Sequence, residues 1–305
     1  MSLGAGAHPH VLVIGASGYL GRAVTERLVE TGHDVVALTR ERAETTPVHH
    51  GDTVRGDLRE PDSLRAAVTP DVDAVIHLAT PLGNEAADLA ALEAIITQLS
   101  GSGRPFLYTS GVWVLGPSPA GAEPFDEDAP PRPLALVGYR HRLEERVLAA
   151  ADEGVRGMVI RPGVAHGRAG GIPALLLDLA QQHREALHVG EERVRWPMVH
   201  VDDLAELFVL ALRDGAARSI FHGVSEGVDT RDLAASVAVA AGVSGTRPWS
   251  LTEAAAALGQ SFAEALATDQ VVSAVRTRHA LGWQPRHPNA LEDLAHGSYR
   301  RLQVG

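Results

Sequence analysis

Three glycines near the start of the chain have the spacing that phosphate binding requires. Gly15, Gly18 and Gly21 lie in the run Gly-Ala-Ser-Gly-Tyr-Leu-Gly, between an apolar segment that predicts a buried strand and an apolar stripe that predicts a helix. In this context the first glycine permits a tight turn, the second lets the backbone approach a pyrophosphate, and the third lets the helix pack closely on the sheet. We therefore predict a dinucleotide site at the helix N-terminus, where free N–H groups and the helix dipole favour a phosphate.

The charges after the second predicted strand bear on which dinucleotide binds. The strand over residues 33–39 is followed by Arg40, Glu41 and Arg42. An acid at this place suits the ribose hydroxyls of NAD, whereas an arginine suits the 2′-phosphate of NADP. Arg40 favours NADP(H) over NAD, and Glu41 is the one feature that favours the opposite choice. The alternative is that both arginines are solvated loop charges.

Histidine and cysteine usage argues against metal and thiol chemistry. The pairs His8/His10 and His49/His50 have no third ligand at metal spacing, so the sequence predicts no metal site. The chain has no cysteine, which excludes disulfides, thiolate catalysis and zinc sites built on cysteine.

The composition is that of an ordinary globular protein. Of the 305 residues, 45% are apolar and 21% are charged, and the net charge is −11. No stripe of Lys and Arg could neutralise a nucleic-acid backbone, so nucleic acid is not an expected partner. The first ten residues lack the basic segment of a signal peptide, and the apolar run after them has only the length of a strand. We expect a cytoplasmic protein without a membrane partner.

Strands alternate with helices through the first half of the chain. The expected strands are at 11–14, 33–39, 53–55, 74–78, 105–109 and 155–161, and the expected helices are at 18–30, 62–68, 84–99 and 137–151. Such alternation implies crossover connections, and hence an α/β fold with a doubly wound, parallel, Rossmann-like sheet. Prolines and acids at 116–133 predict an irregular loop.

The same pattern suggests two parts of unequal size. Residues 1–165 are assigned to the dinucleotide-binding domain, and residues 198–223 are predicted to return to it. After Pro162 the alternation weakens, so 166–197 and 224–305 are assigned to a smaller C-terminal substrate lobe.

Two segments of the returning region are expected to join the main sheet. They are the strand at 198–201, which a helix follows, and the strand at 219–222. Asp202 and Asp203 stand before the apolar helix and are expected to cap its N-terminus.

Further motifs follow the glycine turn in an order that one large family shares. They are Gly56-Asp57-Leu58, His77-Leu78-Ala79-Thr80, Tyr108-Thr109-Ser110, Arg161-Pro162-Gly163-Val164-Ala165-His166-Gly167 and Val199-His200-Val201-Asp202-Asp203. Together they resemble the short-chain dehydrogenase/reductase superfamily, in its extended and atypical branch of NAD-dependent epimerase/dehydratase-like proteins. The likeness spans nearly the whole chain, and it implies the same fold and the same class of cofactor.

The glycine turn, Arg40 and this resemblance together define the expected cofactor site. The residues expected to bind NADP(H) are Gly15, Ser17, Gly18, Tyr19, Leu20, Arg40, Asp57, Leu58, Leu78, Ala79, Thr80, Thr109, Arg142, Pro162 and Val164.

The residues that carry the family's chemistry are substituted in this chain. The family uses a serine, a tyrosine and a lysine, of which the tyrosine is the general acid/base and the lysine holds the nicotinamide ribose, a role that Arg142 could still fill as a fixed cation. Alignment on Leu143-Glu144-Glu145 places Gly138 at the tyrosine and Arg142 at the lysine, and alignment on Gly116 places Gly111 at the serine. Loss of a positioned acid/base costs roughly 10²- to 10⁴-fold in rate, so a standard ketoreductase mechanism is not expected.

Three other side chains are the candidates for catalysis. His166 replaces the family's tyrosine in the loop after the sixth strand and can titrate near neutrality, although a plain loop histidine is the alternative. Ser110 precedes the substituted serine position. Tyr139 lies one residue after the tyrosine position, which on a helix is a rotation of about 100°, and its fourth neighbour is Leu143 rather than lysine.

These patterns favour an enzyme that binds NADP(H) and acts on a small organic substrate with a rearranged active site. In a reduction, the hydride would come from NADPH and the proton from water or His166. A non-redox isomerisation, dehydration or cyclisation on the same scaffold and a non-catalytic NADP(H)-binding regulator are the alternatives. The expected partner is a small molecule, and a homodimer is left open.

Overall fold

The computed structural model describes residues 8–40, 51–190 and 193–300. The chain divides into two units, each with its own core. The first consists of 1–110, 139–160 and 205–221, and the second consists of 111–138, 161–204 and 222–305.

A seven-stranded sheet with the order β10-β6-β5-β4-β1-β2-β3 forms the centre of the first unit. Its strands are β1 (His10–Ile14), β2 (Asp34–Thr39), β3 (Asp52–Arg55), β4 (Ala74–His77), β5 (Pro105–Thr109), β6 (Arg156–Pro162) and β10 (Ile220–Gly223), of which β6 and β10 end in the second unit. All neighbouring pairs from β3 to β6 are parallel. The doubly wound, Rossmann-like sheet expected from the sequence is confirmed. The strand order reverses between β1 and β4, where such sheets bind ligands at the carboxyl ends of their strands.

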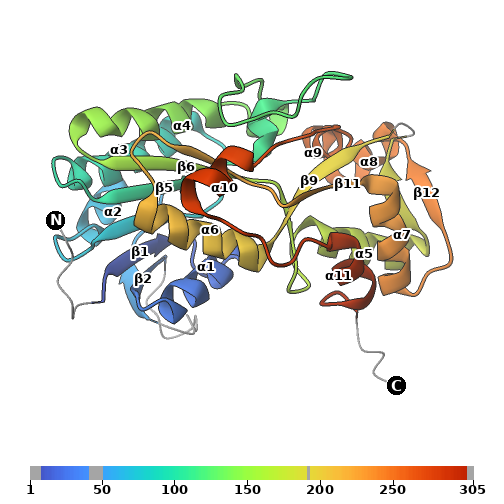
Figure 1. The fold of residues 1–305 in the computed structure, drawn as a ribbon, viewed down its shortest axis with the longest axis horizontal. Helices are drawn as coiled ribbons and strands as arrows, with labels where there is room; N and C mark the ends of the chain where they lie inside the picture. The colour runs from blue at the N-terminus through green and yellow to red at the C-terminus, as the bar shows by residue number, and fades with distance from the viewer. Residues whose placement is uncertain (1–7, 41–50, 191–192, 301–305) are drawn as a thin grey trace. The chain divides into compact units, whose positions relative to one another are not determined.

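Helices cover both faces of this sheet. They are α1 (Tyr19–Glu30), α2 (Pro61–Ala67), α3 (Glu85–Leu99), α4 (Arg140–Ala149) and α6 (Val201–Asp214). Figure 1 shows α3 and α4 on one side of the sheet and α1 and α6 on the other. Leu12 and Phe106 of the sheet pack with Leu64, Ile95 and Leu143 of the helices in one buried cluster. Apolar side chains on both faces of the strands explain their uninterrupted Val, Leu and Ile runs.

The helix expected over 137–151 is interrupted at Gly138. A 3₁₀ turn at Ala135–Val137 ends there, and α4 begins at Arg140, with Tyr139 as its N-cap residue. Gly138 has φ −10° and ψ −77°, a backbone conformation outside the α-helical region. The assumption that Tyr139 lies inside a continuous helix was therefore wrong.

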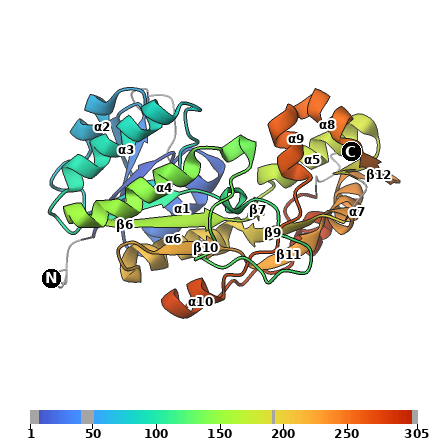
Figure 2. The same cartoon turned by 90° about the horizontal axis from the view of Figure 1, so that it is seen from above.

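The second unit holds two small sheets and a set of helices. Strands β7 (Val164–His166), β9 (Arg195–His200) and β11 (Glu226–Asp229) form one sheet, and β8 (Ala186–Val189) and β12 (Thr246–Trp249) form the other. The helices are α5 (Gly171–His183), α7 (Thr230–Ala241), α8 (Leu251–Leu258), α9 (Gln260–Leu266), α10 (Val275–Leu281) and α11 (Ala290–His296), and a 3₁₀ turn spans Val112–Leu115. Figure 2 shows β7, β9 and β11 side by side.

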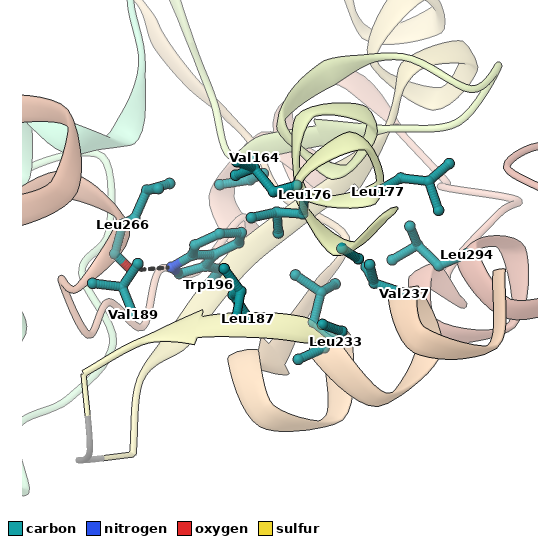
Figure 3. Packing of buried hydrophobic residues seen from close by; sticks show 14 of the residues in the cluster. Val164, Leu176, Leu177, Leu187, Val189, Trp196, Leu233, Val237, Leu266 and Leu294 are labelled. Atoms are coloured by element: carbon teal, nitrogen blue, oxygen red, sulfur yellow. Dashed lines mark hydrogen bonds between the residues drawn. The ribbon is translucent and has the colours of Figure 1, made fainter. Parts of the chain in front are cut away.

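Trp196 lies in the core of this unit (Figure 3). It is 3% exposed and packs among Leu176, Leu187 and Leu233, while its indole N–H donates a 3.0 Å hydrogen bond to the carbonyl of Leu266. A buried indole of this kind needs such a partner, so Trp196 stabilises the unit rather than lining an open pocket.

Only one of the two segments expected to rejoin the main sheet does so. The strand at 219–222 is confirmed as β10, next to β6. The strand expected at 198–201 is instead the end of β9, which pairs with β7 and β11, and Val201 begins α6.

The expectation that Asp202 and Asp203 cap the following helix was wrong. Both residues lie in the first turn of α6 rather than before it. The carboxylate of Asp203 accepts hydrogen bonds from the backbone N–H groups of Arg286 and His287, at 2.8 and 2.9 Å. It therefore holds a later loop in place.

The proline-rich segment 111–138, which the sequence placed in the first domain, clusters with the second unit. Gln270 explains this difference, because its buried amide donates hydrogen bonds to the carbonyls of Val112 and Gly116, at 3.1 and 2.6 Å. The N–H of Phe125 likewise donates to the carbonyl of Val271, at 2.9 Å. These contacts join positions about 150 residues apart, which local sequence patterns do not reveal.

Candidate cofactor-binding site

A cavity of about 750 Å³ lies in the first unit at the carboxyl ends of β1, β2 and β4. The residues that line it are Ile14, Gly15, Ala16, Ser17, Ala37, Leu38, Thr39, Arg40, Gly56, Asp57, Leu58, Arg59, Ala79, Thr80 and Leu82. Seven of them are in the predicted cofactor set, namely Gly15, Ser17, Arg40, Asp57, Leu58, Ala79 and Thr80. The cavity lies where the strand order reverses, which is where this fold binds dinucleotides.

The glycine turn has the backbone that the sequence predicts. Gly15 adopts φ +90°, and a Cβ atom there would lie 2.7 Å from the backbone nitrogen of Ala79. A Cβ atom on Gly21 would lie 2.0 Å from the carbonyl oxygen of Gly15, so this glycine lets α1 pack against the turn. A Cβ atom on Gly18 would meet only that same oxygen, at 3.3 Å. The fold therefore requires Gly15 and Gly21 for packing, whereas at Gly18 it leaves space for a ligand.

The N-terminus of α1 is suited to an anion. Gly18 is its N-cap residue, no side chain caps the helix, and its first turn contains no acid. Uncapped N–H groups and the helix dipole favour a phosphate at this end. Tyr19 and Leu20, also in the predicted set, are the first two residues of the helix.

Two arginines line the cavity, and the sequence identified only one of them. Arg40 follows β2 and is exposed, whereas Arg59 lies in the loop after Asp57. The N–H of Arg59 donates a 2.9 Å hydrogen bond to the Asp57 carboxylate, and the N–H of Asp57 donates to the hydroxyl of Ser63, also at 2.9 Å. The loop that carries Arg59 is thus held by its own hydrogen bonds. Glu41 and Arg42 lie outside the described residues.

The other predicted cofactor residues do not line this cavity. Leu78 follows β4, Thr109 ends β5 and Arg142 lies in α4, all in the first unit. Pro162 and Val164 belong to the second unit.

Arg142 has a partner of its own. Its guanidinium makes a two-pronged ion pair with Glu85 of α3, through Nε and Nη2. A ribose would have to compete with this carboxylate, so the role predicted for Arg142 remains a prediction. Arg140, which the sequence did not single out, donates from Nη1 to the carbonyl of Ser110, at 3.4 Å.

Tyr139 is bound to a buried acid. Its hydroxyl donates a 2.5 Å hydrogen bond to Asp88 of α3, which is 5% exposed and also accepts from the backbone N–H of Leu82. Burial first, and then this hydrogen bond, raise the pKa of Tyr139 to about 12. A tyrosine acid/base needs its pKa lowered instead, so Tyr139 is poorly suited to that role.

Several polar atoms at the ends of β4 and β5 are buried without a hydrogen-bond partner among the described residues. They are His77 Nδ1, Tyr108 Oη, Thr109 Oγ1 and Ser110 Oγ. Unpartnered buried polar atoms are rare in folded proteins and often mark a place where a ligand or water completes the set. Among the three predicted catalytic residues, Ser110 thus has a hydroxyl that is available to hydrogen-bond a ligand.

His77 gives the first unit a testable pH dependence. Burial lowers the pKa of its imidazole to about 4. The unfolded chain, with an ordinary histidine pKa of about 6.5, binds more protons below that pH, so stability is lost as the pH falls from about 6.5 towards 4. The loss attributable to His77 is at most about 1.4 kcal/mol for each pH unit. We expect His77→Gln to be less sensitive to acid than the unmodified protein, as measured by urea unfolding at about pH 5 and about pH 7. Equal pH dependence in the two proteins would contradict this expectation.

His166, the remaining catalytic candidate, is the last residue of β7 and is fully buried in the second unit. Its Nδ1 lies 3.3 Å from Oδ2 of Asp293, and its Nε2 has no partner among the described residues. The acid/base role of His166 remains a prediction.

Among the described residues, no helix is both long and apolar enough to cross a membrane.

A family model described as the NAD dependent epimerase/dehydratase family matches residues 11–222. An uncharacterized protein of Schizosaccharomyces pombe is 33% identical over 309 residues, which cover 95% of this chain and 99% of that protein. A 2-alkyl-3-oxoalkanoate reductase of Stenotrophomonas maltophilia is 29% identical over 255 residues, 76% of each chain.

Two solved structures share the fold. The human epimerase family protein SDR39U1 with NADPH has a TM-score of 0.75 and 23% identity, and the match covers 94% of this chain and 99% of that one. The UDP-glucose 4-epimerase of Thermus thermophilus in complex with NAD has a TM-score of 0.73 and 22% identity, with 95% and 99% covered. The two therefore differ in the dinucleotide they hold.

Proposed function

Because this chain belongs to the NAD-dependent epimerase/dehydratase family, we propose that it is an NADP(H)-dependent oxidoreductase that acts on a small organic substrate. The observation that carries the proposal is the pair of arginines, Arg40 and Arg59, on the wall of the cavity that begins at the glycine turn. A 2′-phosphate distinguishes NADP from NAD, and guanidinium groups are the side chains best suited to bind it.

One of the two solved structures and one relative favour the same choice, although the Thermus thermophilus epimerase holds NAD. The human relative was solved with NADPH, and the relative from Stenotrophomonas maltophilia is a reductase by name. NADPH, when bound, supplies a hydride to an electrophilic carbon of the substrate.

This chain's own residues bind and orient the reactants. The turn at Gly18 and the N-terminus of α1 hold the pyrophosphate, and Arg40 and Arg59 hold the 2′-phosphate. The unpartnered hydroxyl of Ser110 donates a hydrogen bond to the substrate oxygen. The proton that completes a reduction comes from water rather than from Tyr139, whose hydroxyl is bound to Asp88.

The proposal is tested by adding NADPH or NADH to the purified protein with a panel of aldehydes, ketones and conjugated enones. We expect at least one compound class to oxidise the cofactor, and faster with NADPH than with NADH. Saturable NADPH binding without turnover of any class would favour the non-catalytic regulator instead.

With a substrate in hand, Tyr139→Phe separates a structural role from a catalytic one. We expect kcat/KM to fall by much less than the ~10²-fold typical of a lost acid/base. Stability should fall by about 1–3 kcal/mol, because the buried Asp88 loses one of its hydrogen bonds. Steady-state kinetics and urea unfolding measure the two effects. A loss of ~10²-fold or more with unchanged stability would identify Tyr139 as the proton donor.

A further inference from the structure

Three metal-ligating side chains converge in the second unit, at positions far apart in the sequence. His166 ends β7, His200 ends β9, and Asp293 lies in α11. The two strands are neighbours (Figure 2), and they pair in parallel with His166 in register with His200. One ligand atom from each of the three residues lies within 4.8 Å of the others.

The distance between His166 and Asp293 equals the distance between two ligand atoms bound to the same metal ion. Nδ1 of His166 lies 3.3 Å from Oδ2 of Asp293. A charge-assisted hydrogen bond between such groups is shorter, at about 2.7–2.9 Å. Two ligands of a tetrahedral zinc ion, each about 2.0–2.1 Å from the metal, are about 3.3–3.4 Å apart.

The ring of the second histidine packs directly on the backbone that follows the first. Gly167, with φ +99°, follows His166, and a Cβ atom there would lie 2.2 Å from Nε2 of His200. Only a glycine at this position admits the ring of His200 so close to the backbone. Nδ1 of His200 accepts a 3.2 Å hydrogen bond from the backbone N–H of Asp202, so an ion bound through Nε2 moves the ring proton to Nδ1 and replaces this contact with one to Oδ2 of Asp202, which lies 3.7 Å away. A carboxylate in this outer position is usual for metal-bound histidine.

Burial makes the cluster unfavourable without a ligand. His166 is fully buried, and its polar contact among the described residues is the long one from Nδ1 to Asp293, at the nitrogen that an ion would occupy, while Nε2 has no partner with or without an ion. A buried imidazole in this state is poorly compensated for its lost hydration. Asp293 is oriented by Ser298, whose N–H donates to Oδ1 at 2.9 Å.

From this geometry we propose that His166, His200 and Asp293 bind a divalent transition-metal ion of the zinc type. Two imidazoles and one carboxylate suit Zn²⁺ better than Mg²⁺ or Ca²⁺, which prefer oxygen ligands. The ion joins α11 to the strands β7 and β9 and stabilises the second unit. It also occupies the lone pair of His166, so this assignment and the acid/base role of His166 exclude each other.

The test is metal binding by the full chain after chelator treatment and dialysis. Calorimetric titration with Zn²⁺ should give one site per chain, Mg²⁺ should not compete, and Co²⁺ should give the visible absorption of a tetrahedral complex. Zn²⁺ should also raise the unfolding temperature of the unmodified protein. These measurements need no variant, and absence of a stoichiometric site overturns the proposal.

Two variants test the ligand set. Asp293→Asn keeps the shape of the side chain but weakens the ligand, and we expect it to lower Zn²⁺ affinity by at least about 10- to 100-fold. His287→Gln is the matched control, because His287 belongs to an alternative group with His200 and Asp202. We expect no change in this control. Loss of Zn²⁺ binding in His287→Gln, or unchanged Zn²⁺ binding in Asp293→Asn, overturns the assignment. In addition, X-ray absorption spectroscopy of the zinc complex should show two imidazole ligands.

Discussion

Gly18→Val should abolish measurable NADPH binding while the protein stays folded. The branched side chain would occupy the space in front of α1 that the pyrophosphate needs, and φ −71° at Gly18 is open to any residue. Loss of two hydrogen bonds to a charged phosphate, at about 1.5–3 kcal/mol each, weakens binding by roughly 100-fold or more. Fluorescence titration with NADPH measures the affinity, and circular dichroism measures the fold.

The neighbouring glycine provides the matched control. Gly21→Ala places a Cβ atom 2.0 Å from the carbonyl oxygen of Gly15, so this smaller change should destabilise the protein itself. The pair thus separates a glycine needed by the ligand from one needed by the fold. If Gly18→Val binds NADPH normally, the glycine turn does not hold the cofactor.

Arg40→Asp should erase or invert the preference for NADPH over NADH. The change removes one charge-assisted contact to the 2′-phosphate, worth about 1.5–3 kcal/mol or roughly 10- to 150-fold, and adds a repulsive charge. The new carboxylate can also accept hydrogen bonds from the ribose hydroxyls of NADH. Parallel titrations with the two cofactors give the ratio of affinities.

Two further variants show whether the change in cofactor preference arises at the cavity or from the overall charge. Arg59→Ala should weaken NADPH binding and leave NADH binding nearly unchanged, because Arg59 lines the same cavity. Arg65→Asp makes the same change in net charge on α2, outside the cavity lining, and should leave the ratio as it was. An equal effect of Arg65→Asp and Arg40→Asp would show that only the overall charge matters.

The sheet was predictable because its signals are local. Continuous apolar runs such as Val11 to Ile14, closed by Gly15, identify strands buried on both faces, and the alternation with helices identifies parallel crossovers. The glycine turn and Arg40 could be placed for the same reason, since each lies at the end of a strand. Arg59 was missed because nothing in its sequence neighbourhood points to the loop geometry that brings it to the cavity.

The features that escaped prediction depend on contacts between distant residues. Tyr139 meets Asp88 across two helices, 51 positions apart, and only the fold shows that its hydroxyl is occupied. His166 was expected in a loop, but pairing with β9 makes it the end of a buried strand. No metal site was predicted from the histidine pairs that are close in sequence, of which His49/His50 lies outside the described residues. The proposed site instead combines His166 and Asp293, which are 127 positions apart.

A crystal structure of the complex with NADPH tests the central claim most directly. We predict the pyrophosphate at the N-terminus of α1 beside Gly18 and the 2′-phosphate within hydrogen-bond distance of the Arg40 and Arg59 guanidinium groups. A cofactor bound with its 2′-phosphate away from both arginines, or a complex in which NADPH lies outside this cavity, would contradict the proposed specificity.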